Sequence, residues 1–315
     1  METHEFQAAH LGEAFRETRS ACRDAVRKTP SLVHVAHYSR DVFDFSVDTF
    51  DENTRRDPLH RLGRRIGFAV TELDRALQEP RTGTLIRAVV HTERGALFCE
   101  SVVPREMVVG MCASERQDDE PLSEMPDVRA ADKALSALVT QLRARISLQS
   151  QDPGGWTAEN EVKALTSADP MAEHRATVAE DVPDAVLRAC RDAVRPQDLH
   201  YVAYCEGGAV LAELDQFDHP SLAPFFSQIT VGARRAFYRG FTQELGTIAQ
   251  RFNRLASSGP PGGLLIRLVL DVEQGAIYYY RLSIGSYLVG VTVDQSRVVP
   301  TDDRLAALAI ELMAR

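Results

Sequence analysis

A seven-residue segment occurs twice in this chain, and this repetition constrains the possible folds more than any other feature. The letters ACRDAVR stand at 21–27 and again, without a change, at 189–195. A later segment, Leu-Ile-Arg, likewise stands at 85–87 and at 265–267. Because segments recur in the same order at a spacing of roughly 170 residues, we interpret the chain as one domain duplicated rather than as a solenoid of short repeats.

The length of 315 residues agrees with two domains, because single domains usually hold about 100 to 200 residues. We expect a first copy over 1–147 and a second copy over 183–315, joined by a linker over 148–182. The linker mixes Pro, Gly, Ser and acidic residues without periodicity, and we expect one short helix in it, near 159–165. It also holds Trp156, which we expect to pin the linker onto a neighbouring domain rather than to stack on a ligand.

Both halves show the same order of helix and strand patterns. In the first half we expect a helix at 13–28, strands at 34–38 and 42–47, a helix at 60–78, strands at 84–91, 96–103 and 107–113, and a final helix. In the second half we expect a helix at 183–195, strands at 199–205 and 209–214, a helix at 229–256, strands at 264–271, 276–282 and 286–293, and a final helix. This order predicts an α+β fold in which each copy is a five-stranded antiparallel sheet with helices on its faces.

Composition excludes several classes of protein. No stretch approaches the ~18 to 20 uninterrupted apolar residues of a membrane helix, and the polar first ten residues lack the layout of a signal peptide. Five scattered cysteines without CxxC spacing are typical of reduced, buried thiols in a cytoplasm. The net charge of −9 disfavours bulk nucleic-acid binding, but the linker alone carries two basic and seven acidic residues. The folded halves are therefore nearly neutral, and an acidic partner is not excluded.

The residue types that most often carry chemistry do not form a catalytic or metal-binding pattern. His34 and His37 stand three apart on an expected strand, where their side chains point to opposite faces and cannot converge on one ion. Cys22 and Cys190 occupy matching positions on expected helices and are interpreted as small buried residues. The glycines of 259–263 lack the lysine and the spacing of a phosphate-binding loop. We therefore expect no catalytic residue, metal or cofactor.

Arginine gathers near the start of the second helix of each half, and this feature points to a binding surface. Guanidinium groups suit carboxylates and phosphates, so an acidic partner surface fits them, although a solvated helix face is the alternative interpretation. Aromatic residues accompany the arginines in the second half. The candidate partner-binding residues are Arg64, Arg65, Arg234, Arg235, Arg239, Phe237 and Phe241. In addition, Tyr278, Tyr279 and Tyr280 alternate along an expected strand, which makes one face of that strand a candidate contact surface.

The three consecutive strands of each half resemble a known family. They extend from Gly-Thr-Leu-Ile-Arg at 83–87 to Val-Gly at 109–110, and from Gly-Leu-Leu-Ile-Arg at 263–267 to Val-Gly at 289–290. This run of strand, glycine turn, strand and third apolar strand before a final helix resembles the roadblock family, which includes dynein light chains and bacterial GTPase regulators. The resemblance covers both halves and leaves out the linker.

The resemblance implies a fold and a mode of association. Roadblock domains form a five-stranded sheet with one long helix on one face and two helices on the other. They pair so that the second helices pack together and the sheets join edge to edge, which gives a non-catalytic platform for a Ras-like small GTPase or a larger complex. In this chain, the two copies are expected to pair with each other within the chain, at high effective concentration, or in a homodimer.

These observations predict a cytoplasmic, non-enzymatic scaffold or regulator that binds a small Ras-like GTPase or a multiprotein complex. An alternative from another class is a chaperone or immunity-type protein that masks a secreted effector or toxin in a tight one-to-one complex, independent of nucleotide state. An enzyme is a third interpretation, and it requires a deep polar pocket with converging His, Asp or Cys side chains.

Overall fold

The computed structural model describes residues 2–52, 54, 56–113, 126–156, 174–257, 259 and 261–314. The strands are β1 (His4–Gln7), β2 (Leu32–Ser39), β3 (Val42–Asp48), β4 (Leu85–Thr92), β5 (Gly95–Val103), β6 (Glu106–Ala113), β7 (Arg175–Val178), β8 (Tyr201–Glu206), β9 (Ala209–Asp215), β10 (Leu265–Val272), β11 (Gly275–Ser283) and β12 (Ser286–Thr292). The helices are α1 (Arg16–Lys28), α2 (Asp57–Ala76), α3 (Pro126–Arg145), α4 (Asp184–Ala193), α5 (Val231–Ser257) and α6 (Val298–Met313). Short 3-10 segments are η1 (Glu13–Phe15), η2 (Pro153–Gly155), η4 (Pro220–Phe226) and η5 (Gln295–Arg297).

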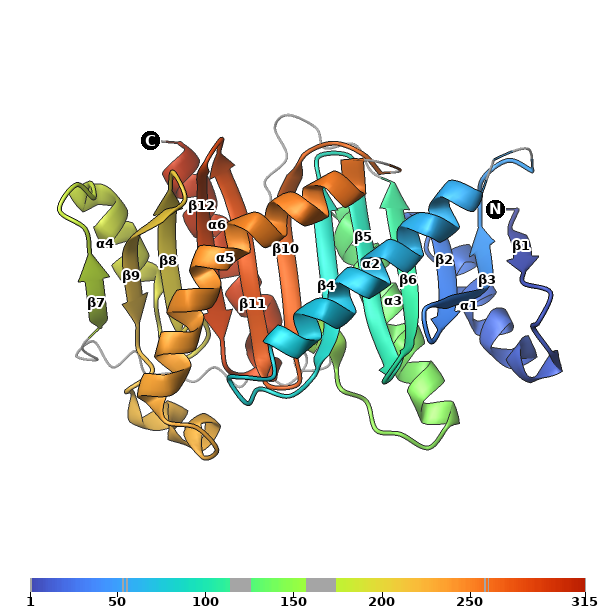
Figure 1. The fold of residues 1–315 in the computed structure, drawn as a ribbon, viewed down its shortest axis with the longest axis horizontal. Coiled ribbons are helices and arrows are strands. Elements are labelled where there is room, and N and C mark those ends of the chain that lie inside the picture. The colour runs from blue at the N-terminus through green and yellow to red at the C-terminus, as the bar shows by residue number, and fades with distance from the viewer. Residues whose placement is uncertain are drawn as a thin grey trace.

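All described strands belong to one antiparallel sheet of mixed α/β architecture (Figure 1). Their order is β1-β3-β2-β6-β5-β4-β10-β11-β12-β8-β9-β7. The sequence of strands on one side of the β4–β10 junction therefore repeats, in mirror order, on the other side. At the junction Arg87 lies opposite Asp271 and Arg267 lies opposite His91, so that matching residues of the two strands occupy matching positions. The two halves share one continuous sheet and are not two separate domains joined only by a linker.

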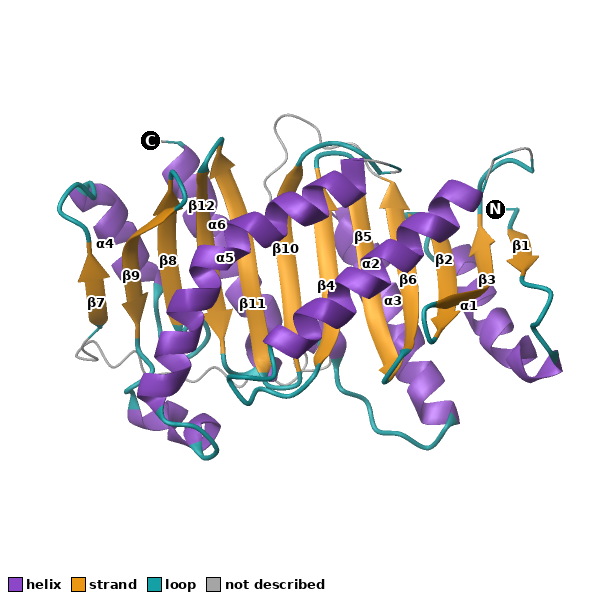
Figure 2. Ribbon diagram, in the orientation of Figure 1, coloured by secondary structure: helices purple, strands orange, loops and turns teal. Residues whose placement is uncertain are grey.

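Helices cover both faces of this sheet (Figure 2). The two long helices, α2 and α5, cross one face, and α1, α3, α4 and α6 lie against the other (Figure 1). Each face buries its own apolar cluster, centred on residues such as Ile66 and Phe252 on the α2–α5 face and Leu135 and Leu305 on the opposite face. The helices form because their apolar residues recur with helical periodicity, and burying one such side chain typically stabilises the fold by about 1.5 to 3 kcal/mol.

The expected elements are present among the described residues, and two further strands join them. β1 pairs with β3, and β7 pairs with β9, so the sheet has six strands on each side of the junction instead of the expected five. Both extra strands are four residues long, which is too short for a readable alternation of polar and apolar residues. β7 and η2 lie in the segment expected to be an irregular linker, whereas the short helix expected near 159–165 lies outside the described residues.

No helix in the described part of the chain is long and apolar enough to cross a membrane.

Candidate functional site

The two long helices lie side by side on one face and run in opposite directions (Figure 1). In the C-terminal part of α2, Glu72 accepts a hydrogen bond from Arg251 of α5. Beyond the end of α2, the carbonyl oxygen of Pro80 accepts a hydrogen bond of 3.2 Å from Nε of Arg234 at the start of α5. The C-terminal half of α5 therefore faces the arginine-rich N-terminal half of α2.

A groove of about 450 Å³ opens between these helix halves. We call it the arginine groove, and it is lined by Asp41, Arg64, Arg65, Phe68, Arg251, Arg254 and Leu255. Phe68 is 54% exposed, and both arginines of α2 are exposed. Four guanidinium groups and one carboxylate line this groove, so it suits a partner that presents carboxylates or phosphates beside an apolar group.

The arginines of the groove differ in whether they form an ion pair with a carboxylate of the same chain. Arg251 pairs with Glu72. Within the described residues, no carboxylate forms an ion pair with Arg64, Arg65 or Arg254. Exposed guanidinium groups without an internal partner remain available to an external anion. Of the predicted site residues, Arg64 and Arg65 are the two that the structure brings into this groove.

Two of the predicted arginines at the start of α5 are buried instead. Arg234 is fully buried, its guanidinium lies 4.8 Å from the centre of the Phe226 ring, and burial lowers its pKa. Arg235 is 7% exposed and donates two hydrogen bonds, of 2.6 and 2.8 Å, to the carboxylate of Asp215. These two arginines hold the helix to its own chain, and their surroundings leave no open face for a partner.

The first half contains the same kind of clamp. Arg56 donates hydrogen bonds of 2.8 Å from Nε and Nη2 to the two carboxylate oxygens of Asp48 at the end of β3. Burial acts to raise the pKa of Asp48, but the nearby His34 and the hydrogen bonds from Arg56 outweigh it and hold that pKa below its ordinary value. An arginine at a helix start thus ties each long helix to the end of a strand in both halves.

The remaining predicted residues lie along the first half of α5. Arg239 donates a hydrogen bond of 2.7 Å to Glu213 and keeps part of its side chain exposed. Phe237 is half-buried and stacks on Phe241, which is itself 5% exposed and belongs to the core. The structure therefore does not bring this group together with Arg64 and Arg65.

Phe68, Arg251 and Arg254 are not among the residues predicted from the sequence. The two arginines stand three apart near the end of α5, where they share a helix face. The pairing of second helices that the roadblock resemblance implies could have indicated these two arginines. An antiparallel pair places the end of one helix beside the start of the other. Their position in the groove depends on that pairing and not on any local motif.

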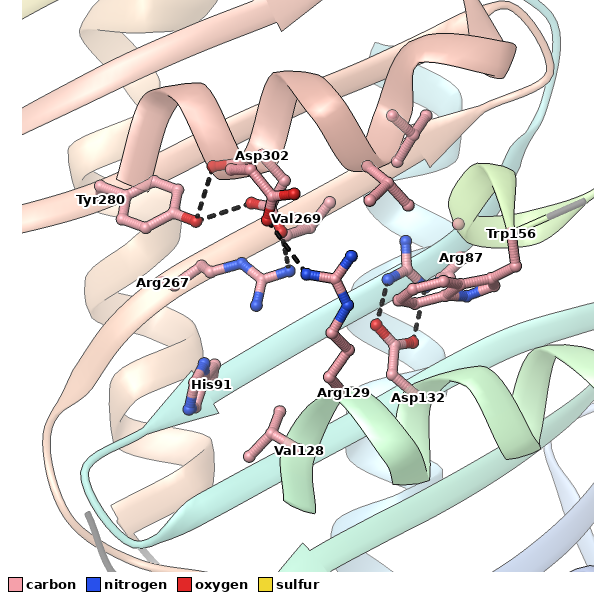
Figure 3. A pocket seen from close by; sticks show the side chains of 14 residues that line it. Arg87, His91, Val128, Arg129, Asp132, Trp156, Arg267, Val269, Tyr280 and Asp302 are labelled. Atoms are coloured by element: carbon pink, nitrogen blue, oxygen red, sulfur yellow. Dashed lines mark hydrogen bonds and ion pairs between the residues drawn. The ribbon is translucent and has the colours of Figure 1, made fainter. Parts of the chain in front are cut away.

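The opposite face of the junction carries a buried charge network (Figure 3). Arg87 of β4 donates two hydrogen bonds to Asp132 of α3, and a third, of 2.6 Å, to Asp271 of β10. Arg267 of β10 pairs with Asp302 of α6. The cavity between these groups holds about 30 Å³, roughly the space of one water molecule, and its charges are largely paired. We interpret it as a structural network that joins the halves.

The linker segment around η2 covers this network. The backbone N–H of Gly154 donates a hydrogen bond of 2.8 Å to Asp271, and Gln295 donates one of 3.0 Å to the carbonyl oxygen of Asp152. Trp156 lies at the rim of the cavity, with the guanidinium of Arg129 5.5 Å from its ring centre (Figure 3). As expected, Trp156 pins the linker onto folded parts of the chain.

The cysteines of the described residues are buried thiols, and His37 is held between the carboxylates of Asp44 and Glu106. Burial raises the pKa of every thiol to about 12, which disfavours the nucleophilic thiolate; the five are Cys22, Cys99, Cys112, Cys190 and Cys205. His34 stacks near His60 on the α2 side, while His37 packs against Phe15 and Phe45 on the other face, as the strand alternation predicts. In the described part of the chain, no three His, Cys, Asp or Glu residues are placed to hold a metal ion.

No family model and no curated protein matches the sequence. Solved structures are similar to it, and two of them show the extent of the likeness. One is described as MglB with a tetrameric arrangement, with 15% identity and a TM-score of 0.31 over 44% of this chain and 98% of that chain. The other is the gliding protein MglB from Thermus thermophilus, with 14% identity and a TM-score of 0.32 over 44% of this chain and 99% of that chain.

Proposed function

We propose that this protein is a non-enzymatic scaffold or regulator, in which two roadblock-like copies over 1–147 and 183–315 pair within one chain. The pair presents the arginine groove to a small Ras-like GTPase. The observation that carries the proposal is the β4–β10 junction, because it joins the halves into one sheet and sets α2 and α5 side by side on one face. Segment 148–182 connects the copies.

The internal pairing agrees with what the roadblock resemblance implies. Sheets joined edge to edge and second helices packed together are both features of the family's pairs, and both occur here between the halves of one chain. A covalent connection keeps the partner half at high effective concentration, so the pair persists at any protein concentration. This arrangement supports a constitutive platform.

The composition of the arginine groove supports a protein partner. Arginine and aromatic residues are enriched among those that dominate binding energy at protein interfaces, and the groove combines Arg64 and Arg65 with the half-exposed ring of Phe68. The residues lie on a helix pair, so their backbone is held and needs little ordering on binding. Arg239 and Phe237 stay candidates for a wider contact along α5.

The test uses the small GTPases of the source organism, each purified and loaded with GDP or with a non-hydrolysable GTP analogue. We expect one of them to bind the full chain in calorimetry, with different affinities for its two nucleotide states. The double variant Arg64→Glu/Arg65→Glu is expected to weaken binding at least about tenfold, because it reverses two charges that face the partner. The control Arg188→Glu/Arg191→Glu reverses two exposed charges at α4, on the other face, and is expected to leave binding unchanged.

Two results would overturn the proposal. One is the absence of binding by any of these GTPases in either nucleotide state. The other is an equal loss of affinity in both double variants, which would remove the α2–α5 face from the interaction. If the protein instead forms a one-to-one complex with a secreted effector or toxin, irrespective of nucleotide, the chaperone or immunity interpretation replaces this one.

A further inference from the structure

Arg234 differs from the other buried arginines in the described part of the chain. The guanidinium groups of Arg56, Arg87 and Arg235 each meet at least one aspartate. Arg234, the immediate neighbour of Arg235 at the start of α5, is fully buried, yet no described carboxylate forms an ion pair with it. A buried cation without a counter-charge is costly and rare in folded proteins. The chain therefore does not neutralise Arg234 as it neutralises the other three.

The guanidinium of Arg234 uses only part of its hydrogen-bonding capacity. Its Nε donates a hydrogen bond of 3.2 Å to the carbonyl oxygen of Pro80, in the turn that follows α2 of the first half. Nη1 and Nη2 carry the other N–H donors of the group. Both are buried, and neither has a hydrogen-bond partner among the described residues. These two adjacent nitrogens form a fork whose donors have lost water and have gained no acceptor from the chain.

The ring of Phe226 compensates the guanidinium only in part. Its centre lies 4.8 Å from Cζ of Arg234, which is within the range of a cation–π contact. The face of an aromatic ring attracts a cation, but it is a much weaker hydrogen-bond acceptor than an oxygen atom. The contact therefore does not replace the acceptors that Nη1 and Nη2 lack.

The position of Arg234 in the fold also favours an anion. Arg234 stands in the first turn of α5, a helix of 27 residues, and the N-terminal end of a helix carries a partial positive charge. The carboxylates of Asp215 and Asp218 approach the same helix start, but both accept hydrogen bonds from Arg235. Buried donors, a full charge and a helix N-terminus thus combine where α5 meets the turn after α2.

The surroundings of Arg234 restrict the ligand to a small ion. The side chain has no exposed surface, so a protein surface cannot reach it. Phe226, which is half-buried, belongs to η4, a 3-10 segment of seven residues with Pro224 inside it. A 3-10 segment of this length is uncommon because its hydrogen bonds have poor geometry, and proline removes one further donor. A displacement of Phe226 with η4 would admit a small ion and leave the sheet intact.

We propose that Arg234 binds a small oxyanion, a phosphate or carboxylate group whose two oxygens accept hydrogen bonds from Nη1 and Nη2. The fork of a guanidinium matches two such oxygens, and charge-assisted hydrogen bonds of this kind are stronger than neutral ones. Because Nε of the same side chain binds Pro80, the anion strengthens a contact between the two halves. The site lies at the end of the helix pair opposite the arginine groove and does not depend on a GTPase partner.

The test follows the Arg234 side chain in NMR spectra of the full chain. Its Nε–H signal is identified as the one that is lost in the Arg234→Met variant. Sodium phosphate then replaces sodium chloride at constant ionic strength and pH. We expect the signal to shift with saturation and a Kd of about 1 mM, as a small ion held by one guanidinium allows. Sodium acetate replaces chloride in a second titration, and the anion that binds more tightly shows whether the site takes a phosphate or a carboxylate.

Thermal unfolding of variants locates the binding. In chloride, we expect Arg234→Met to be at least as stable as the wild type, because it removes a buried cation that has no carboxylate partner. When phosphate replaces chloride, the Tm of the wild type is expected to rise by about 2 °C more than that of Arg234→Met. The control Arg64→Glu/Arg65→Glu, in the arginine groove, is expected to keep both the NMR shift and the rise in Tm.

Three results would overturn the proposal. In the first, the Arg234 signal does not move when phosphate or acetate replaces chloride at concentrations well above the expected Kd, which would leave water as the occupant of the fork. In the second, Arg234→Met keeps the full rise in Tm, so the anion acts elsewhere. In the third, Arg64→Glu/Arg65→Glu abolishes the shift, so the effect originates in the arginine groove. Failure of every GTPase to bind would change none of these measurements.

Discussion

The two halves hold their long helices to the sheet with similar contacts, but they contribute different buried charges to the junction between them. An arginine clamps each long helix to a strand end, through Arg56 and Asp48 in one half and Arg235 and Asp215 in the other. At the junction the correspondence ends, because Arg87 faces an aspartate across the strands whereas Arg267 faces His91. The clamp is thus alike in the two halves, and the contact across the junction is not.

Because of this difference, Arg87 of the first half pairs with a buried carboxylate that only the second half provides. Asp271 of β10 accepts a hydrogen bond from Arg87 and stands where the first half has His91. Two identical first halves would place an arginine opposite a histidine at both positions of the junction, without this carboxylate. The charge pattern therefore favours pairing of the first half with the second over pairing with another first half.

The largest expected effect comes from removing the central guanidinium. Arg87→Ala leaves two buried carboxylates, Asp132 and Asp271, without their cation, and breaking a buried pair in this way typically costs about 3 to 5 kcal/mol. Arg267→Ala leaves one carboxylate, that of Asp302, which keeps 19% of its side chain exposed, so its cost is smaller. Unfolding in urea at neutral pH measures both; equal losses would contradict the asymmetry of the junction.

Two matched substitutions, each of which creates a cavity in one half, test whether the halves unfold together. Leu135 of α3 packs over Gly110, and Leu305 of α6 packs over Gly290 in the same way. Replacing either leucine by alanine is expected to lower the free energy of unfolding by about 2 to 5 kcal/mol. Because the sheet is continuous, each variant should shift one shared cooperative transition in calorimetry. Two transitions, of which each variant shifts only its own, would show halves that fold independently.

A third expected effect is a change in pH dependence that is confined to the first half. Burial raises the pKa of Glu100 from 4.5 to about 8, although Arg87 acts to lower it, and the corresponding residue of the second half is Tyr280. Between these two pH values the unfolded chain releases a proton that the folded chain keeps, so this group makes stability fall as pH rises.

Glu100→Gln is therefore expected to flatten the decline in stability between pH 4.5 and 8. Tyr280→Phe serves as the control, since burial raises the pKa of that phenol well above 10 and it does not titrate in this window. Urea unfolding at a series of pH values provides the measurement. If the free energy of unfolding falls with pH as steeply in the glutamine variant as in the wild type, Glu100 does not cause the decline.

Much of the secondary structure was predictable because its signals are local. The step of apolar residues in α2, such as Leu62, Ile66 and Val70, follows from helix geometry alone, and turn glycines such as Gly95 and Gly275 separate the strands. The four-residue strands β1 and β7 carried no such signal. Their pairing is decided by the free edges of β3 and β9, which lie far from them in sequence.

The candidate site was predictable only in part, for an electrostatic reason. A run of arginines shows that guanidinium groups are present but not which of them meet carboxylates of the same chain. Asp215 and Asp218 engage Arg235, while Arg64 and Arg65 meet no described carboxylate at ion-pair distance. Exposure, and with it availability to a partner, depends on which strand end each helix start contacts.

Periodicity and turn chemistry act over a few neighbouring residues, so the internal repetition, the order of helices and strands, and the faces on which apolar residues lie can be predicted from the sequence alone. That β4 meets β10, and that α5 brings Arg251 and Arg254 to Arg64, follows only from the tertiary structure. These outcomes depend on contacts between residues more than a hundred positions apart, whose stabilisation comes from burial and charge pairing that no local pattern specifies.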